Sequence, residues 1–192
     1  MANGRVITGF SDPWVAEYAA SGGTVTYSNA MALARGVEVS LSPESSDDNK
    51  FYADNIVAEN ATGMFTGGTV TLTVDGLKDA ARKLIFGLPT AVDSWTAYDN
   101  TIEIPYVGIG FIVRYMEDGA TTYMPVVLAK TMFQLDETSA ATQEDEIDWQ
   151  TQDLTANLFR DDSAKQAWKF VGTAQTTQAL ALAMMKTKLG VA

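Results

Sequence analysis

Two runs of alternating apolar and polar residues constrain the fold of this chain more than any other feature. In residues 35–42 the apolar positions are Val37, Val39 and Leu41, and the polar ones are Glu38, Ser40 and Ser42. In residues 67–76 the apolar positions are Val70, Leu72 and Val74, and the polar ones are Thr69, Thr71 and Thr73. Because successive side chains of a strand point to opposite faces, both runs predict strands with one buried face. Pro43 lacks a backbone N–H, so we expect it to end the first strand.

The interval between these runs, residues 43–68, has a different character. Hairpin loops usually contain about 2–5 residues, so this interval is too long for a simple turn. It begins with polar and acidic residues and then carries the large apolar side chains of Phe51, Tyr52, Ile56, Val57, Met64 and Phe65. Such side chains are unfavourable in water, so we expect either the same chain or a neighbouring copy to cover them. We favour a neighbouring copy.

The remaining patterns predict a β-rich domain with two helices. Short strands are expected at 14–18 and 24–28 around Gly22-Gly23, and longer ones at 106–116 and 123–129, the latter covered on both faces. Residues 77–87 predict a helix with Asp75 as its N-cap and Gly87 at its end. Later segments predict strands in 149–162 and near 168–171, and a terminal helix over 174–189 with a stripe of Ala179, Leu182, Met185 and Leu189.

These elements predict a mainly β fold: an antiparallel β-sandwich or barrel with one helix between strands and a C-terminal helix. We expect one domain over residues 1–192, with a long protruding loop at 43–68 and an acidic loop at 136–148. Residues 136–153 contain seven acidic residues and no basic one, which is typical of a solvated loop.

Composition excludes several functional classes. The net charge is −11, from 13 basic and 24 acidic residues, which disfavours a protein that grips nucleic-acid phosphates. There is no cysteine and no histidine, so disulfides, thiolate metal sites and histidine-based catalysis are excluded. We find no signal-peptide pattern and no apolar run near the ~20 residues of a membrane helix, and expect a cytosol-like compartment and no membrane partner.

Three groups of side chains could form functional sites, but a structural role explains each group more simply. Asp47, Asp48, Asn49, Asp54 and Asn55 offer oxygen ligands for a hard cation, but they lack the EF-hand spacing and favour turns. Asp161 and Asp162 could act as acid and base, but more simply mark a turn. The aromatic residues Trp14, Tyr18, Trp95 and Tyr98 could line a sugar site, although core packing is favoured. We therefore predict no enzyme, no cofactor and no metal.

Several segments resemble the major tail protein of long-tailed bacteriophages, the phi13-type tail tube family. They are RVITGF at 5–10, SNAMALARGVEVSLSPESSDDNKFYADN at 28–55, GGTVTLTVDGL at 67–77 and IDWQTQDLTANLFRDDSA at 147–164. They occur in the same order as in that family and span nearly the whole chain.

The resemblance implies a structural virion protein, assembled in the host bacterial cytoplasm. Such subunits form rings, typically six-membered, whose sheets join into one barrel, and the rings stack into a hollow tube for genome ejection. The subunit binds itself, the tape measure, tail-tip and tail terminator proteins, and lets DNA pass without tight binding. The expected inter-subunit contact loop comprises Asp47, Asp48, Asn49, Lys50, Phe51, Tyr52, Asp54, Asn55 and Ile56. The candidate lumen-facing residues are Glu38, Ser40, Thr69, Thr71 and Thr73.

Other functions stay open at this point. A type VI secretion-like tube protein would share the fold and differ in its cargo. A monomeric β-sandwich that binds carbohydrate would need an ordered aromatic platform. A hydrolase is disfavoured because the chain has neither histidine nor cysteine.

Overall fold

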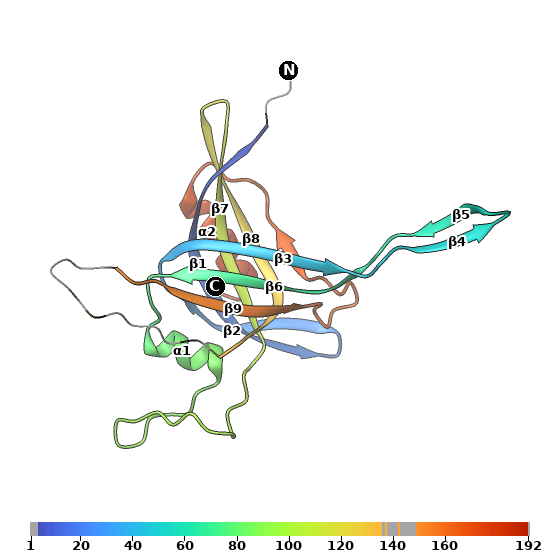
Figure 1. Cartoon of the computed structure of the whole chain (residues 1–192). Coiled ribbons are helices and arrows are strands. Elements are labelled where there is room, and N and C mark those ends of the chain that lie inside the picture. Colours follow the sequence, from blue (N-terminus) through green and yellow to red (C-terminus); the bar gives the residue numbers. More distant parts are fainter. Residues whose placement is uncertain (1–3, 136, 138–141, 143–148, 192) are drawn as a thin grey trace.

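One antiparallel sheet organises the chain in a computed structural model, which describes residues 4–135, 137, 142 and 149–191. The strands are β1 (Val6–Ser21), β2 (Thr24–Ala32), β3 (Gly36–Ser45), β4 (Asn49–Ala53), β5 (Ile56–Ala61), β6 (Phe65–Val74), β7 (Val107–Glu117), β8 (Ala120–Phe133), β9 (Gln152–Phe159) and β10 (Lys169–Val171). The helices are α1 (Asp79–Phe86) and α2 (Gln178–Lys188). Eight strands form the main sheet in the order β2-β1-β7-β8-β9-β6-β3, with β10 also paired to β8, while β4 and β5 pair separately (Figure 1).

The larger hydrophobic core lies on the face of the sheet that carries α1. It gathers inward side chains from β1, β6, β7, β8 and β9, together with Ile85 and Phe86 of α1. The alternation of Val70, Leu72 and Val74 places all three in this core, as the sequence predicts. Burying each such side chain contributes about 1.5–3 kcal/mol, so the sheet and α1 are held mainly by this core.

The second core lies between the opposite face of the sheet and α2. Ala181, Met185 and Leu189 are buried there against Ile112 and Val127. Two consecutive valines, Val126 and Val127, thus contribute to different cores, which confirms that this strand is covered on both faces.

Glycines in β7 allow this close packing. A Cβ atom at Gly110 would lie 2.8 Å from Met185 and Leu189, and one at Gly108 would lie 2.5 Å from the ring of Tyr27. Both glycines therefore stand where neighbouring side chains come close to the backbone of β7.

The predicted turns and helices are present, with differences at their ends. Gly22-Gly23 and Asp118-Gly119 have positive φ angles and close the β1–β2 and β7–β8 hairpins. Gly87 is left-handed at the end of α1, as expected. Asp75 is not the N-cap, which is Lys78; the Asp75 carboxylate instead pairs with Arg35 and accepts its backbone N–H.

Three further predictions about individual residues were wrong. Pro43 does not end the strand, because β3 is at the edge of the sheet and tolerates a residue without an N–H. Val37 is 56% exposed, since an irregularity between Gly36 and Glu38 breaks the alternation. In α2 the buried stripe contains Ala181 rather than Ala179.

The structure confirms an antiparallel, mainly β fold, with 53% strand and 11% helix. The sheet is not closed: among the described residues no ladder joins β2 to β3, so these two strands are its edges. Almost all of the acidic loop predicted at 136–148 lies outside the described residues.

Three projections extend from the sheet in Figure 1. Strands β4 and β5 point to the right, and the β7–β8 hairpin rises with the start of β1. The segment 87–106 after α1 descends below the sheet. The interval at 43–68 is therefore not a loop. Strands β3 and β6 are paired as far as Ser45 and Phe65, and β4 and β5 then pair with each other to form a projecting β-ribbon.

The contact between β7 and α2 can be tested by a substitution. Gly110→Val should lower the free energy of unfolding by about 1–3 kcal/mol, because its Cβ would overlap Met185 and Leu189. Gly67→Val is the matched control, since a Cβ there meets only the Leu158 carbonyl oxygen at 3.7 Å. Urea unfolding measures both, and equal losses would contradict the proposed packing.

Candidate functional site: a projecting arm and a polar sheet face

The projecting ribbon, residues 46–64, is called the arm. Its base is fastened to the sheet by main-chain and side-chain hydrogen bonds. The Ser46 N–H donates to the Met64 carbonyl at 2.9 Å, and the Ser46 Oγ accepts from the Met64 N–H at 3.0 Å. Asp48 accepts from the Gly63 N–H at 2.9 Å. These contacts continue the β3–β6 pairing into the arm.

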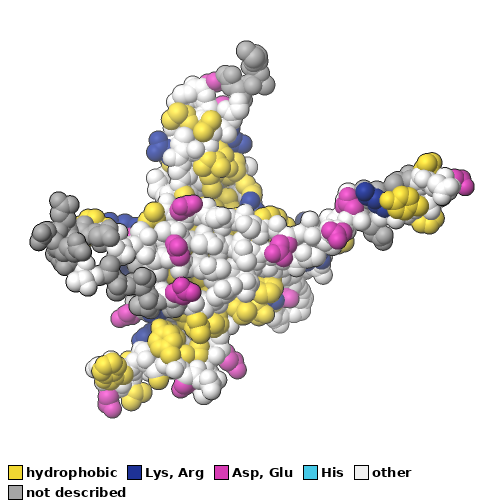
Figure 2. All heavy atoms as spheres, viewed as in Figure 1, with side chains coloured by type: hydrophobic (Ala, Val, Ile, Leu, Met, Phe, Trp, Pro, Cys, Tyr) yellow, Lys and Arg dark blue, Asp and Glu magenta, His cyan; other side chains and the backbone are white. Residues whose placement is uncertain are grey.

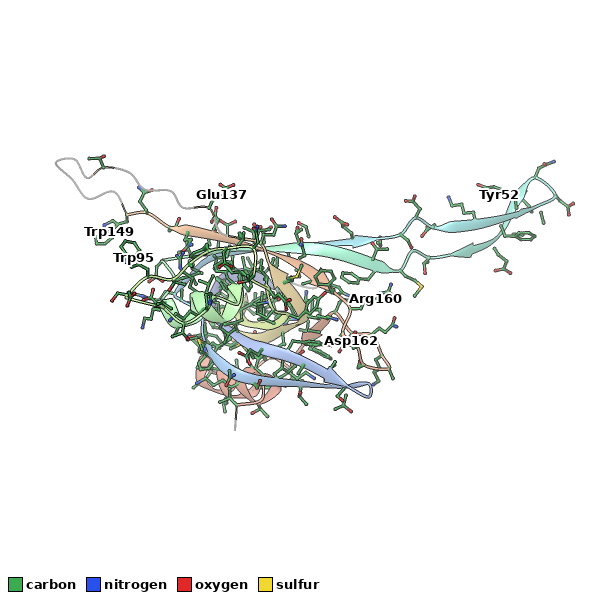
Figure 3. The ribbon with its side chains drawn as sticks, turned by 90° about the horizontal axis from the view of Figure 1, so that it is seen from below. Tyr52, Trp95, Glu137, Trp149, Arg160 and Asp162 are labelled. Atoms are coloured by element: carbon green, nitrogen blue, oxygen red, sulfur yellow. The ribbon has the colours of Figure 1, made fainter. Side chains whose placement is uncertain are left out.

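Aromatic stacking fixes the strand from which the arm leaves the sheet. Phe65 stacks on Trp168, with ring centroids 4.6 Å apart and planes 3° from parallel. The Arg160 guanidinium donates to the Phe65 carbonyl oxygen. Arg160 lies between the base of the arm and the body in Figure 3, so the arm starts from a well-packed support.

The tip of the arm is a tight turn. Asp54 and Asn55 both have positive φ angles, 51° and 64°, which suit a two-residue hairpin turn. The prediction that these two residues form a turn is therefore confirmed. Asp47, Asp48 and Asn49 lie at the other end of the arm, and no group of three or more acidic residues suited to a metal occurs among the described residues.

Large apolar side chains on the arm are exposed in the isolated chain. Phe51 is 64% exposed, Tyr52 61% and Ile56 67%. Tyr52 is labelled near the far end of the arm in Figure 3, and Figure 2 shows apolar side chains around the same end. Among the described residues, no other part of the chain covers them. Exposed apolar side chains on a polar ribbon are typical of a surface that binds a partner.

A polar sheet face lies beside the arm on β3, β6 and β9. Cross-strand pairing sets its side chains in rows: Glu38 beside Thr73 and Asp153, Ser40 beside Thr71 and Thr155, and Ser42 beside Thr69 and Asn157. We call these nine residues the polar face. The predicted lumen-facing residues Glu38, Ser40, Thr69, Thr71 and Thr73 are thus brought together on one face.

The polar face carries no basic residue. Its two charged residues are acidic, and the Thr73 hydroxyl donates to the Asp153 carboxylate at 2.6 Å. Figure 2 shows this side of the molecule as mostly polar surface with scattered acidic side chains. A surface of hydroxyls and carboxylates offers phosphate groups no cationic partner.

The other candidate acids have structural partners. Asp161 is 4% exposed and accepts from the Ser163 N–H and hydroxyl at 3.2 and 2.7 Å. Asp162 accepts from Lys130 Nζ and from the Tyr18 hydroxyl, both at 2.7 Å. Each carboxylate therefore serves a separate local network, which favours the turn interpretation over an acid–base pair.

The Asp162 network links distant strands. The ammonium of Lys130 on β8 also lies 4.4 Å from the ring centroid of Tyr106 and 5.2 Å from that of Tyr18 on β1. The hydrogen bond from Lys130, with a further one from Tyr18, lowers the pKa of Asp162 below its usual value. Burial, opposed by a hydrogen bond from the Asp162 backbone, raises the pKa of Tyr18 to about 12.

The four candidate sugar-binding aromatics do not gather. Trp14 lies under Lys186 of α2, whereas Tyr18 belongs to the Asp162 network. Trp95 is 81% exposed and Tyr98 51%, on the projecting segment 87–106, so core packing was wrong for these two. Sequence reasoning had no signal for their exposure, because the segment has no strand or helix pattern.

Comparison with protein-family models and with curated proteins finds no match for this chain. Within the described residues, neither helix has the length and apolar character needed to cross a membrane.

Alkaline pH should test the position of Tyr18. A phenol with a raised pKa stabilises the fold fully below pH ~10, and this contribution is lost as the pH rises toward about 12. Between pH 9 and 11 the parent should therefore lose about 1 kcal/mol more stability than Tyr18→Phe, after allowance for partial exposure. Urea unfolding at both pH values measures this difference. Tyr98→Phe should behave like the parent, and a Tyr18→Phe protein that does so too would contradict the assignment.

Proposed function

We propose that this protein is a structural subunit: a major tail tube protein of a long-tailed bacteriophage, which assembles into stacked rings around a DNA conduit. The observation that carries this proposal is the arm, a β-ribbon whose Phe51, Tyr52 and Ile56 are more than 60% exposed. A chain gains nothing from such a ribbon while it is alone, because its apolar side chains stay in water. In an assembly they become buried contact residues.

The free sheet edges support assembly as well. Within the part of the chain that the structure describes, strands β2 and β3 each leave one side without a partner strand in the main sheet. Exposed edges are prone to pair with other chains, and pairing between copies turns them into part of a larger sheet. An open, curved sheet with two free edges is the form expected of one segment of a ring-shaped barrel.

The polar face supports the role of conduit. With DNA inside the ring, a lining of hydroxyls, amides and carboxylates would repel phosphate and leave no basic binding site along the path. The rows of Glu38, Ser40 and their neighbours have this composition.

The alternatives are less well supported. A type VI secretion-like tube would use the same arm and edges, so cargo alone separates it from the proposed function. A carbohydrate-binding module would be favoured by a flat cluster of aromatic rings, and the ring pairs of the described residues include none between any two of Trp14, Tyr18, Trp95 and Tyr98.

Electron microscopy of the purified protein over a concentration series tests assembly. The parent should form rings or tubes, and Phe51→Ala with Tyr52→Ala should not at the same concentrations. Truncating contact residues of this kind costs about 2 kcal/mol each, so the threshold concentration should rise ~100-fold or more.

Tyr98→Ala is the control, since its side chain is also exposed but lies outside the arm. Circular dichroism should show that all the variants are folded. A parent that stays monomeric at every concentration, even with a purified tail-tip complex added to initiate assembly, would overturn the proposal.

Charge reversal on the polar face tests its orientation. Tubes of Glu38→Lys with Asp153→Lys should retain duplex DNA at low salt, because the lining then offers cationic contacts, and release it at high salt. Parent tubes should retain none. The control is Glu117→Lys, which reverses a charge at the end of β7, in the β7–β8 hairpin and outside the polar face. Equal retention by the control would show that the polar face does not line the conduit.

A further inference from the structure

The helix α2 is apolar beyond the side that it buries. Ala181 and Met185 face the sheet, but Leu180 is 53% and Met184 40% exposed on the rest of the helix. Val171 of the neighbouring strand β10 is also 53% exposed. A helix with apolar residues all round is normally buried on all sides, so the outer side of α2 lacks a cover in the isolated chain.

A groove runs between α2 and β10 at this place. It encloses a cavity of about 420 Å³, lined among others by Pro125, Val127, Phe170, Val171, Met184 and Lys188. We call it the C-terminal groove. Its floor is apolar and its one charged lining residue is Lys188, whose Nζ lies 3.8 Å from the centroid of the Phe170 ring. Grooves with apolar walls and few polar groups bind apolar side chains.

The C-terminal segment that forms β10 and α2 is basic, in a chain that is strongly acidic. Residues 163–192 contain four lysines and no acidic residue, whereas the whole chain has a net charge of −11. Of the two lysines that end α2, Lys188 lines the groove, whereas Lys186 lies over the ring of Trp14 on β1. The arm has the opposite character, with four acidic residues and one lysine over residues 46–64. Both surfaces therefore combine exposed apolar side chains with charge, and the charges are of opposite sign.

We infer that the C-terminal groove of one copy receives the apolar tip of the arm from a second copy. This inference rests on the proposed function and names the surface to which the arm binds. Phe51 and Tyr52 would enter beside Phe170 and Met184, while acidic residues of the arm face Lys188. Complementary charge would steer the arm to this groove and away from the acidic surfaces elsewhere.

The arm does not reach the groove of its own chain. In Figure 1 it points away from α2, and in Figure 3 Tyr52 is at the opposite side of the molecule from the red helix. Since the arm and the groove are different surfaces, their contact can repeat head-to-tail, which generates the closed ring or extending stack that the proposed function requires.

Disulfide trapping between two variants tests the contact, because the parent has no cysteine. Ala53→Cys, next to Tyr52 on β4, and Val171→Cys are purified separately, mixed and oxidised. A covalent heterodimer should form rapidly, and Phe51→Ala in the first partner should slow it at least ~10-fold. The matched control is Val92→Cys, which is 72% exposed in the projecting segment 87–106.

The control separates this inference from the proposed function. Trapping with Val171→Cys but not Val92→Cys supports the groove, whether or not rings are seen by microscopy. Rings without trapping at Val171, or with equal trapping at Val92, overturn the inference and leave the proposed function standing; the groove then has another occupant.

Charge exchange gives an independent readout. Lys188→Glu should lower the trapping rate at least ~10-fold in low salt, because it reverses the charge on the wall of the groove. Glu59→Lys in the arm partner should restore it, because Glu59 is paired with Phe51 across the arm. Absence of restoration, with all variants folded by circular dichroism, would mean that these charges do not meet and would contradict the assigned pairing.

Discussion

The pairing of β3 with β6 is the interaction on which the rest of the molecule depends. Val70, Leu72 and Val74 of β6 enter the main core, and this burial holds the pair in the sheet. The same alternation exposes Thr69, Thr71 and Thr73 on the polar face. Both strands then continue outward and carry the arm. Core, polar face and arm are thus consequences of one ladder, since a one-residue slip would exchange the two faces.

The arm combines a rigid base with an exposed apolar tip. An isolated two-stranded ribbon is only marginally stable in water, so the arm needs a fixed base. Phe65 on Trp168 and Arg160 on the Phe65 carbonyl supply that base. The tip, with Phe51 and Tyr52, has no such support from the rest of the described residues. Binding to a second copy would therefore stabilise the arm at the same time as it joins the subunits.

Much of the fold was predictable because strand and turn signals are local. Alternation found the inward face of β6 and, except at Val37, that of β3, and Gly22-Gly23 marked the β1–β2 turn. The failures have local causes too. Pro43 is tolerated within β3 because β3 is an edge strand. Asp75 does not cap α1, because its carboxylate pairs with Arg35. Residues 43–68 were expected to form a loop but contain a β-ribbon. The sequence did not indicate its strands, because they are short, alternate weakly and are not buried.

The sequence by itself determined the strand-rich class, the absence of histidine and cysteine chemistry, the acidic charge, and an apolar segment in need of a cover. Only the tertiary structure decided that this segment projects as a ribbon and that β3, β6 and β9 share one polar face. It also decided that a groove lined by Lys188 lies between β10 and α2. The reason is physical: alternation specifies which side of a strand is apolar, but the partners of each strand arise from contacts between residues far apart in the chain.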